Sequence, residues 1–587
     1  MTDKDIIESK VGTSAVLSSA VKVGLIGGVI VVSMALEGLF QAFVTRDIVS
    51  GVLSMSQMLL LVALLFMAQI AVSRSGTKQP QFVLLSGAVS AFVSSLLLVA
   101  LIALGSIVKL GDMFINATPN LYDILTFKLG LIVGSLSLVV LATVVGILAG
   151  VINLLPAAVR RAIVYALATV VTVGLLQDLI KTTLQDFDAL SFVTRFLYDP
   201  NGLSLPGAIT LLVLVAAANY GWARRAAQVR QRFNALPSKS RRTLRWGSIG
   251  IGVLIMLLLP MFSGLYLSQV FDTIGLYLLM GLGLNIVVGF AGLLDLGYVA
   301  FFAIGAYTVG ILTSPEHATG IISNWWLALP FGVAMALLAG VVLGIPVLKM
   351  RGDYLAIVTL GFGEIVRLLA ISDFLKPWEG GAQGIQRIPN PDIGPFTFGP
   401  SQLTLPLLGT IQWGVSQQFY YLFLASCILV MFIATRVKDS RIGRAWMAVR
   451  EDEDVAQAMG INLVATKLMA FGLGASFGGL AGAIASSQLQ SVYPQNLTFL
   501  ISVYVLSVII IGGMGSIPGV IVGALAVAGL PELLREVGDY RYLFFGAALV
   551  VVMLTRPEGL LPEARRRLEL EEFREEEVKE ESATSPA

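Results

Sequence analysis

Apolar runs long enough to cross a membrane recur along this 587-residue chain and limit what it can fold into. A membrane-spanning helix needs about 20 apolar residues, and only helices and closed barrels satisfy their backbone groups within lipid. The composition agrees, because 56% of the residues are hydrophobic and only 13% are charged, whereas soluble domains carry about 25% charged residues. The sequence therefore predicts an all-α integral membrane protein, a polytopic helical bundle of about 16 apolar segments.

The apolar runs form two groups. Six runs lie in the first half, and about ten lie in the second, several of them short for a full span. The first six cover residues 21–43, 52–72, 82–108, 129–155, 162–180 and 206–222. The others lie near residues 249–268, 273–288, 297–313, 329–348, 354–371, 419–435, 465–488, 500–512, 518–531 and 542–555. Short runs indicate discontinuous or re-entrant helices, which transporters use around a midplane site.

A basic segment separates the two groups. Residues 224–245 contain eight Arg or Lys side chains and no acidic one, and Pro237 with nearby serines indicates a linker. Between two spans, such a segment favours a cytoplasmic position over a nucleic-acid contact, and counting spans from it puts both termini in the cytoplasm. We expect a membrane bundle of about six helices without assigned function at 1–223, a basic cytoplasmic linker at 224–247, a domain of about ten helical segments at 248–562 and a charged, partly disordered cytoplasmic tail at 563–587.

One apolar stretch in the second half is interrupted. Residues 285–307 contain Gly289, Gly292 and Gly297, with a single carboxylate, Asp295, among them. Irregular backbone at membrane depth is tolerated only where protein or a water-filled cavity satisfies its polar groups, and a carboxylate there marks a functional site by default. The stretch therefore points to a pathway through the bilayer, and so to transport.

Enzyme signatures are absent from the chain. There is no Gly-Lys dipeptide, and therefore no phosphate-binding loop, and the single His excludes a His-Glu-x-x-His zinc motif. The single Cys excludes an intramolecular disulfide. We predict no catalytic residue, no metal site and no cofactor in this chain; if ATP drives transport, another chain binds it with magnesium.

A second informative segment, residues 441–462, is polar and lies between two spans. Ile442, Ala445, Trp446 and Val449 share one helical face, four acidic residues follow at 451–454, and Gly460 can end the helix. It is either a surface helix lying on the lipid headgroups or a docking helix for a cytoplasmic partner.

Five segments of the second half resemble one known family. They read GLLDLGY within residues 289–307, RGDYLAIVTLGFGEIVR at 351–367, GRAWMAVREDEDVAQAMG at 443–460, IGGMGS at 511–516 and RPEGLLP at 556–562. They are similar to the LivM-type permease of bacterial ABC importers for branched-chain amino acids. The resemblance covers about residues 248–563, and the first half has no counterpart in it.

This resemblance implies partners and roles. The family works in the bacterial cytoplasmic membrane with a second, LivH-like permease, two ATPase subunits that bind ATP, and a periplasmic or surface-anchored amino-acid-binding protein. Its Glu-Ala-Ala-x-x-x-Gly contact with the ATPase is matched only loosely, by Glu453, Ala456 and Gly460. The candidates for ATPase coupling are Trp446, Arg450, Glu451, Glu453, Ala456 and Gly460.

Two further sets of residues are candidates for roles within the membrane. Asp295 either lines the pathway or caps the interrupted helix, and the pathway candidates are Asn285, Gly289, Gly292, Asp295 and Tyr298. Glu364 and Arg367, three residues apart on one helix face, are predicted to form a structural ion pair.

Alternatives to amino-acid import remain open at this stage. The nearest is urea or another small solute, carried by a related permease branch that tends to read Ser-Leu-Gly-His where this chain reads Asp-Leu-Gly-Tyr at 295–298. An intramembrane enzyme is disfavoured by the missing motifs. A scaffold without transport activity is a third possibility, which the first half alone would fit.

Overall fold

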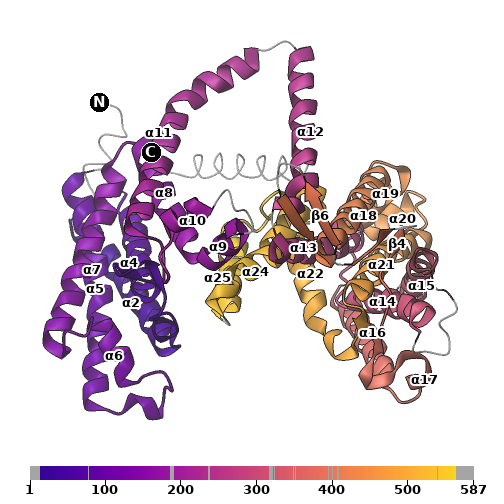
Figure 1. Cartoon of the computed structure of the whole chain (residues 1–587), viewed down its shortest axis with the longest axis horizontal. Coiled ribbons are helices and arrows are strands. Elements are labelled where there is room, and N and C mark those ends of the chain that lie inside the picture. The colour runs from indigo at the N-terminus through magenta and orange to yellow at the C-terminus, as the bar shows by residue number, and fades with distance from the viewer. Residues whose placement is uncertain are drawn as a thin grey trace. The chain divides into compact units, whose positions relative to one another are not determined.

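The computed structural model describes residues 13–76, 79–185, 191–235, 238–262, 264–315, 322, 324–347, 350, 352–393, 396–399, 401–405, 409–538 and 540–563. The chain divides into two compact units, Met1–Ile249 and Gly250–Ala587, which Figure 1 colours from indigo to magenta and from magenta to yellow. Within the described residues, eleven helices are long and apolar enough to cross a membrane, and five shorter apolar helices accompany them. The predicted all-α polytopic fold is confirmed.

The first unit consists of long helices joined by short elements. Its parts are α2 (Thr13–Leu36), α3 (Leu39–Ala42), β1 (Asp47–Val49), β2 (Leu53–Ser54), α4 (Met55–Arg74), α5 (Pro80–Ile107), η2 (Leu110–Asp112), α6 (Pro119–Leu125), α7 (Leu131–Leu154), α8 (Ala157–Leu175), α9 (Gln177–Gln185), α10 (Ser191–Leu197) and α11 (Leu205–Ala235). Six of these helices are candidate spans, which matches the six apolar runs of the sequence.

Small residues let the helices of this unit approach closely. A Cβ added to Gly87 on α5 would lie only 2.3 Å from the carbonyl oxygen of Gly146 on α7. On another face of α5, the hydroxyl of Ser94 donates a hydrogen bond of 2.8 Å to the carbonyl oxygen of Gly24 on α2. Close approach at small residues and hydrogen bonds between helices are the usual means of packing in lipid, where apolar burial gives little advantage.

The second unit follows α12 (Ser238–Phe262), which crosses the boundary between the units. Its helices are α13 (Gly264–Leu284), η4 (Asn285–Phe290), α14 (Val299–Thr313), α15 (Trp325–Val347), α16 (Asp353–Ile371), α17 (Lys376–Glu379), η5 (Gly381–Gln383), α18 (Val415–Lys438), α19 (Arg441–Glu451), α20 (Glu453–Ala458), α21 (Leu463–Gln488), η6 (Pro494–Asn496), α22 (Phe499–Gly512), α23 (Ile517–Ala524), η7 (Leu525–Gly529), α24 (Leu530–Leu533), η8 (Leu534–Val537) and α25 (Tyr540–Thr555).

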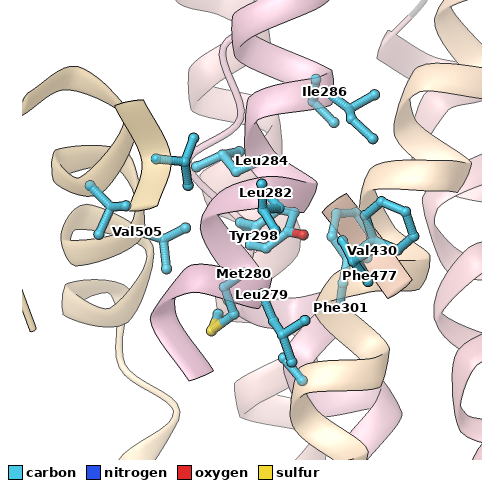
Figure 2. Close-up of a cluster of buried hydrophobic side chains, with 14 of the residues drawn as sticks. Leu279, Met280, Leu282, Leu284, Ile286, Tyr298, Phe301, Val430, Phe477 and Val505 are labelled. Atoms are coloured by element: carbon cyan, nitrogen blue, oxygen red, sulfur yellow. The ribbon is translucent and has the colours of Figure 1, made fainter. Parts of the chain in front are cut away.

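Two helices, α13 and α21, form the centre of this unit. Their most apolar windows are 72% and 78% buried, whereas the windows of α15, α16 and α18 are 28–33% buried. A Cβ at Gly283 of α13 would lie 2.8 Å from the carbonyl oxygen of Gly474 of α21, so glycines bring the two backbones together. Figure 2 shows the apolar core around them, with Leu282, Tyr298 and Phe477 in the interior.

Short antiparallel strand pairs complete the described structure. They are β1 with β2, β3 (Ile385–Gln386) with β8 (Ser491–Val492), β4 (Asp392–Ile393) with β5 (Phe396–Thr397), and β6 (Ser401–Leu405) with β7 (Gly409–Trp413). The β3–β8 pair joins the segment after α17 to the segment after α21.

The basic segment differs from the expected linker loop. It is helical on both sides of residues 236–237, because α11 continues to Ala235 and α12 begins at Ser238. The physical reason is its composition, since Arg, Ala and Gln are good helix formers and Pro237 is its only proline. The predicted tail beyond residue 563 lies outside the described residues.

Candidate functional site

The interruption predicted at residues 285–307 is confirmed. Helix α13 passes into the π-helical turn η4, the chain is irregular at 291–298, and α14 begins at Val299. Gly292 has φ +72°, a conformation that favours glycine. The backbone amides of Ala291 and Leu293 donate to the carbonyls of Ile286 and Val287, at 3.1 and 3.0 Å. The protein itself therefore satisfies part of the broken backbone, as it must at membrane depth.

A second interruption lies beside the first. Helix α22 ends at Gly512, α23 begins at Ile517, and Gly513 and Gly515 between them have φ +117° and +81°. The amide nitrogen of Gly515 donates a hydrogen bond of 2.9 Å to Oδ1 of Asn285, the first residue of η4. The two breaks are 230 residues apart in the chain and are joined by the side chain of a predicted pathway residue.

The segment that follows α25 closes over this second break. The amides of Leu560 and Leu561 donate to the carbonyl oxygens of Ile511 and Gly512, at 2.8 and 2.9 Å. Nζ of Lys438, at the end of α18, pairs with Oε1 of Glu563 at 2.7 Å and donates to the carbonyl oxygen of Gly515 at 3.2 Å. The RPEGLLP motif of the sequence thus has a structural role next to the IGGMGS motif.

Arg450 connects the polar helix α19 to both breaks. Its Nη1 donates a hydrogen bond of 2.6 Å to the carbonyl oxygen of Gly289 in η4. A Cβ at Gly515 would lie 3.4 Å from the same nitrogen, and a Cβ at Gly292 would lie 2.8 Å from Cγ of Arg450. We call Asn285, Gly289, Arg450, Lys438, Gly515 and Glu563 the junction. It unites predicted pathway residues with a predicted coupling residue.

The irregular stretch between η4 and α14 is tightly packed. Oδ1 of Asp295 accepts a hydrogen bond of 2.9 Å from the amide of Gly297, and Oδ2 is buried without a hydrogen-bond partner among the described residues. The hydroxyl of Thr359 on α16 accepts from the amide of Leu296 at 3.0 Å. Tyr298 is fully buried, and its hydroxyl donates to the carbonyl oxygen of Gly474 at 2.7 Å (Figure 2).

These side chains therefore hold the broken backbone in place in this conformation. Asn285, Asp295 and Tyr298 are at most 1% exposed in the chain by itself. Substrate could reach them only after the surrounding helices move, and their contact with substrate stays a prediction.

The predicted docking segment forms two helices and not one. Asp452 separates α19 from α20, and its Oδ1 accepts from the amides of Asp454 and Val455, both at 2.9 Å. An acidic residue at this N-cap position ends one helix and begins the next, which the acidic run alone did not reveal. Gly460 follows α20 with φ +85°, as expected for a residue that ends a helix.

The predicted coupling residues divide into buried and exposed ones. Trp446 and Ala456 are buried in this chain, and the indole nitrogen of Trp446 donates to the carbonyl oxygen of Thr466 at 2.8 Å. Glu453 forms an ion pair of 2.7 Å with the buried Lys467. Glu451 is exposed. Trp446, Ala456 and the Glu453–Lys467 ion pair hold α19 and α20 against the bundle. In this conformation Trp446 and Ala456 are not accessible to a partner.

Two residues that the sequence analysis did not name are the most exposed apolar side chains of this segment. Val455 is 59% exposed and Met459 is 79% exposed. They are four residues apart, with Val455 inside α20 and Met459 directly after its last residue, Ala458, and exposed apolar residues at this spacing are typical of anchors that enter a groove. An apolar pair with this spacing after the acidic run at 451–454 was the signal that could have identified them.

Glu364 and Arg367 form the predicted ion pair on α16. Nε of Arg367 donates to both carboxylate oxygens of Glu364, at 3.1 and 3.0 Å. The two side chains are 44% and 28% exposed in this chain, so the pair lies on the surface of the unit and not in its core. Its structural role stays a prediction.

Comparison with known proteins identifies the family. The family model described as branched-chain amino acid transport system, permease component, matches residues 266–553. The chain is 40% identical over 303 residues to the high-affinity branched-chain amino acid transport system permease protein LivM of Escherichia coli, covering 50% of this chain and 70% of the relative. The chain belongs to this permease family. The matched residues contain both helix breaks and α19 with α20.

More distant relatives agree with this assignment. The permease is 25% identical over 341 residues to a probable LivM permease of Methanocaldococcus jannaschii, covering 51% of this chain and 93% of the relative. It is 25% identical over 311 residues to the permease LivH of Salmonella typhimurium, covering 50% and 95%. Similarity to both LivM and LivH indicates a multi-pass membrane subunit of a multi-subunit transporter. No solved structure matches the chain.

Proposed function

We propose that this permease carries branched-chain or related hydrophobic amino acids into the bacterial cell as the membrane subunit of an ATP-driven importer. The observation that carries the proposal is the 40% identity to LivM over 303 residues, together with the family match at 266–553 that contains both helix breaks. The names of the relatives above refer to branched-chain amino acids, and none of them favours urea. The pathway runs along the broken helices, where backbone polar groups are available to a zwitterionic solute.

The proposed partners are those that the resemblance to importer permeases implies, and the similarity to both LivM and LivH supports the second permease. A LivH-like second permease completes the pathway, two ATPase subunits bind ATP with magnesium, and a binding protein delivers the solute. The basic ends of α11 and α18 support an orientation with both termini in the cytoplasm. This orientation puts the junction and the pair α19–α20 on the side of the ATPases.

Coupling runs from α20 through α19 to the junction. Val455 and Met459 enter a groove of the ATPase, while Trp446 and the Glu453–Lys467 ion pair hold the two helices against α21. A shift of α19 then moves Arg450, whose hydrogen bond to Gly289 pulls on the π-helical turn η4. Because Asn285 joins η4 to Gly515, both breaks respond together.

Reconstitution tests the transport proposal. The purified full chain should show no ATPase activity alone. Together with its partner subunits in vesicles, it should take up leucine, isoleucine or valine only when ATP and the binding protein are both present. Proton-driven uptake by the chain alone, or urea uptake in preference to leucine uptake, would contradict the proposal.

A substitution at Gly460 tests the coupling surface. Gly460→Arg places bulk, charge and backbone strain at the end of α20. It should uncouple transport and reduce co-purification of the ATPase subunits while the protein still inserts. Gly76→Arg is the matched control, since Gly76 also has positive φ and a Cβ there meets no atom within 4 Å. Unchanged co-purification of the ATPase subunits with both Gly460→Arg and Glu453→Lys would place the contact elsewhere.

A further inference from the structure

An apolar pocket lies beside α19. Its volume is about 350 Å³, and its walls come from four elements, α15, α18, α19 and α21. Val341, Val437, Ile442, Leu468 and Gly472 are among the lining residues, and Trp446 is another. The described lining residues include no charged side chain, so the pocket suits a hydrocarbon ligand and not a zwitterion.

The pocket lies near the end of α18 and the beginning of α21, and it opens toward the surface of the unit. Val437 is one residue from the end of α18, and Leu468 is in the second turn of α21. Leu337, Ile442 and Met469 on its walls are 42%, 38% and 42% exposed. The C-terminal end of α18 and the N-terminal end of α21 are connected by the polar helices α19 and α20. Because these polar helices belong outside the hydrocarbon region, we expect the opening to lie where acyl chains meet headgroups.

Basic residues are the chain neighbours of two residues that line the pocket. Arg436 precedes the wall residue Val437, and Arg441 precedes the wall residue Ile442; both arginines are exposed. One carboxylate, Asp439, lies between them in the chain and is also exposed. Arg444 follows one turn later. Because Lys438 pairs with Glu563, residues 436–444 have three exposed arginines and one exposed carboxylate. Basic pockets between membrane helices on the cytoplasmic side bind anionic lipid headgroups.

We propose that this pocket binds one acyl chain of an anionic phospholipid, whose phosphate is held by Arg436 and Arg441. The apolar walls accept the chain, and the charge beside them selects the headgroup. The bound lipid packs against Ile442 and Trp446, and therefore against the helix that carries Arg450. The site would make the position of α19, and with it the coupling of the permease, sensitive to the anionic lipid content of the membrane.

Substitutions that fill the pocket test the acyl-chain contact. A Cβ at Gly472 would lie 3.1 Å from Cγ2 of Val341, so Gly472→Leu and, from the opposite wall, Val341→Phe both occupy the same space. Gly361→Leu on α16 is the matched control, since a Cβ there meets no atom within 4 Å. Native mass spectrometry of the full chain with added phosphatidylglycerol measures lipid retention, and circular dichroism checks that each variant is folded.

We expect both filling variants to bind phosphatidylglycerol about tenfold more weakly than the wild type, the effect of losing about two buried methylenes. Gly361→Leu should bind like the wild type. Unchanged retention by folded Gly472→Leu and Val341→Phe would overturn the assignment of the acyl chain to this pocket.

The headgroup is tested by charge and by lipid type. The double variant Arg436→Gln, Arg441→Gln should bind phosphatidylglycerol no more tightly than phosphatidylcholine. The control variant Arg161→Gln, Arg225→Gln removes two exposed arginines of the first unit and should keep the preference for phosphatidylglycerol. Equal binding of the two lipids by the wild type would overturn the anionic selectivity. Loss of bound phosphatidylglycerol when the partner subunits assemble would show that the pocket is a protein contact and overturn the proposal. Retention of phosphatidylglycerol in the assembled complex would support the lipid site.

Discussion

The two units of the permease differ in how much of their apolar helices is buried by protein. The six candidate spans of the first unit are continuous helices in the described residues, and the buried share of their windows is 11–44%. The second unit encloses α13 and α21, which are 72% and 78% buried, and has two broken stretches beside them. These two broken stretches lie next to the most buried helices, where surrounding protein can satisfy their backbone groups. The first unit is therefore a bundle of continuous helices, whereas the second unit has the broken helices that a transport pathway needs.

The largest effect is expected where the broken stretch touches a neighbouring backbone. A Cβ at Gly297 would lie 1.8 Å from the carbonyl oxygen of Thr359, and backbone cannot move aside as a side chain can. Gly297→Leu should therefore prevent folding of the second unit, detected as loss of the monodisperse peak in size-exclusion chromatography. Gly361→Leu, in open space, should behave like the wild type.

The corresponding change in the first unit sharpens the comparison. Gly87→Leu meets the carbonyl oxygen of Gly146 and should loosen that bundle, yet inserted and assembled protein should retain uptake. Loss of all uptake in such a protein would show that the units do not function separately.

The next largest effect is expected at the junction. Arg450→Gln removes a charge-assisted hydrogen bond to Gly289, worth about 1.5–3 kcal/mol. Leucine uptake by the assembled transporter should fall by about tenfold or more while ATP hydrolysis continues, and Arg450→Lys should restore part of the uptake. Arg444→Gln on the same helix is the control. A parallel fall of uptake and hydrolysis in Arg450→Gln would reduce Arg450 to a purely structural role.

Removing an ion pair is expected to lower the free energy of unfolding by a smaller amount, which differs between the two units. Lys467 is 2% exposed and pairs with Glu453, which is 21% exposed, so Lys467→Met should destabilise the second unit by about 2 kcal/mol, less than the roughly 3–5 kcal/mol of a fully buried pair. In the first unit Arg46 pairs with Asp178, which is 65% exposed, and Asp178→Asn should cost less than about 1 kcal/mol. Thermal unfolding midpoints of the two variants measure the difference; equal shifts would contradict it.

The smallest effect on uptake is expected from removing the first unit altogether. A chain that starts at Ser238, the first residue of α12, keeps every residue of the family match and both breaks. It should insert, assemble with its partners and retain substantial uptake. If a truncated protein that is demonstrably inserted and assembled transports nothing, part of the pathway lies before Arg224.

The local features of the chain were predictable from its sequence. The apolar runs predicted the sixteen long and short helices, because each span needs a fixed length of apolar residues wherever it packs. The glycines at 289–297 predicted the break for a similarly local reason, since φ values such as that of Gly292 suit few other residues. The basic charge of residues 224–245 was also evident from the sequence. That most of this segment is helical follows from the helix propensity of its residues, which the prediction of a linker did not take into account.

Contacts between distant parts of the chain were decided only by the tertiary structure. Nothing local in Arg450 indicates that it reaches Gly289, 161 residues away, or that Asn285 joins Gly515. The sequence placed Trp446 on the apolar face of its segment and made it a candidate for ATPase coupling, but its burial against α21 depends on how that helix packs. Sequence determined where the helices run and where they break, because these depend on neighbouring residues. Which broken ends meet depends on the packing of the whole unit, because distant partners share no local pattern.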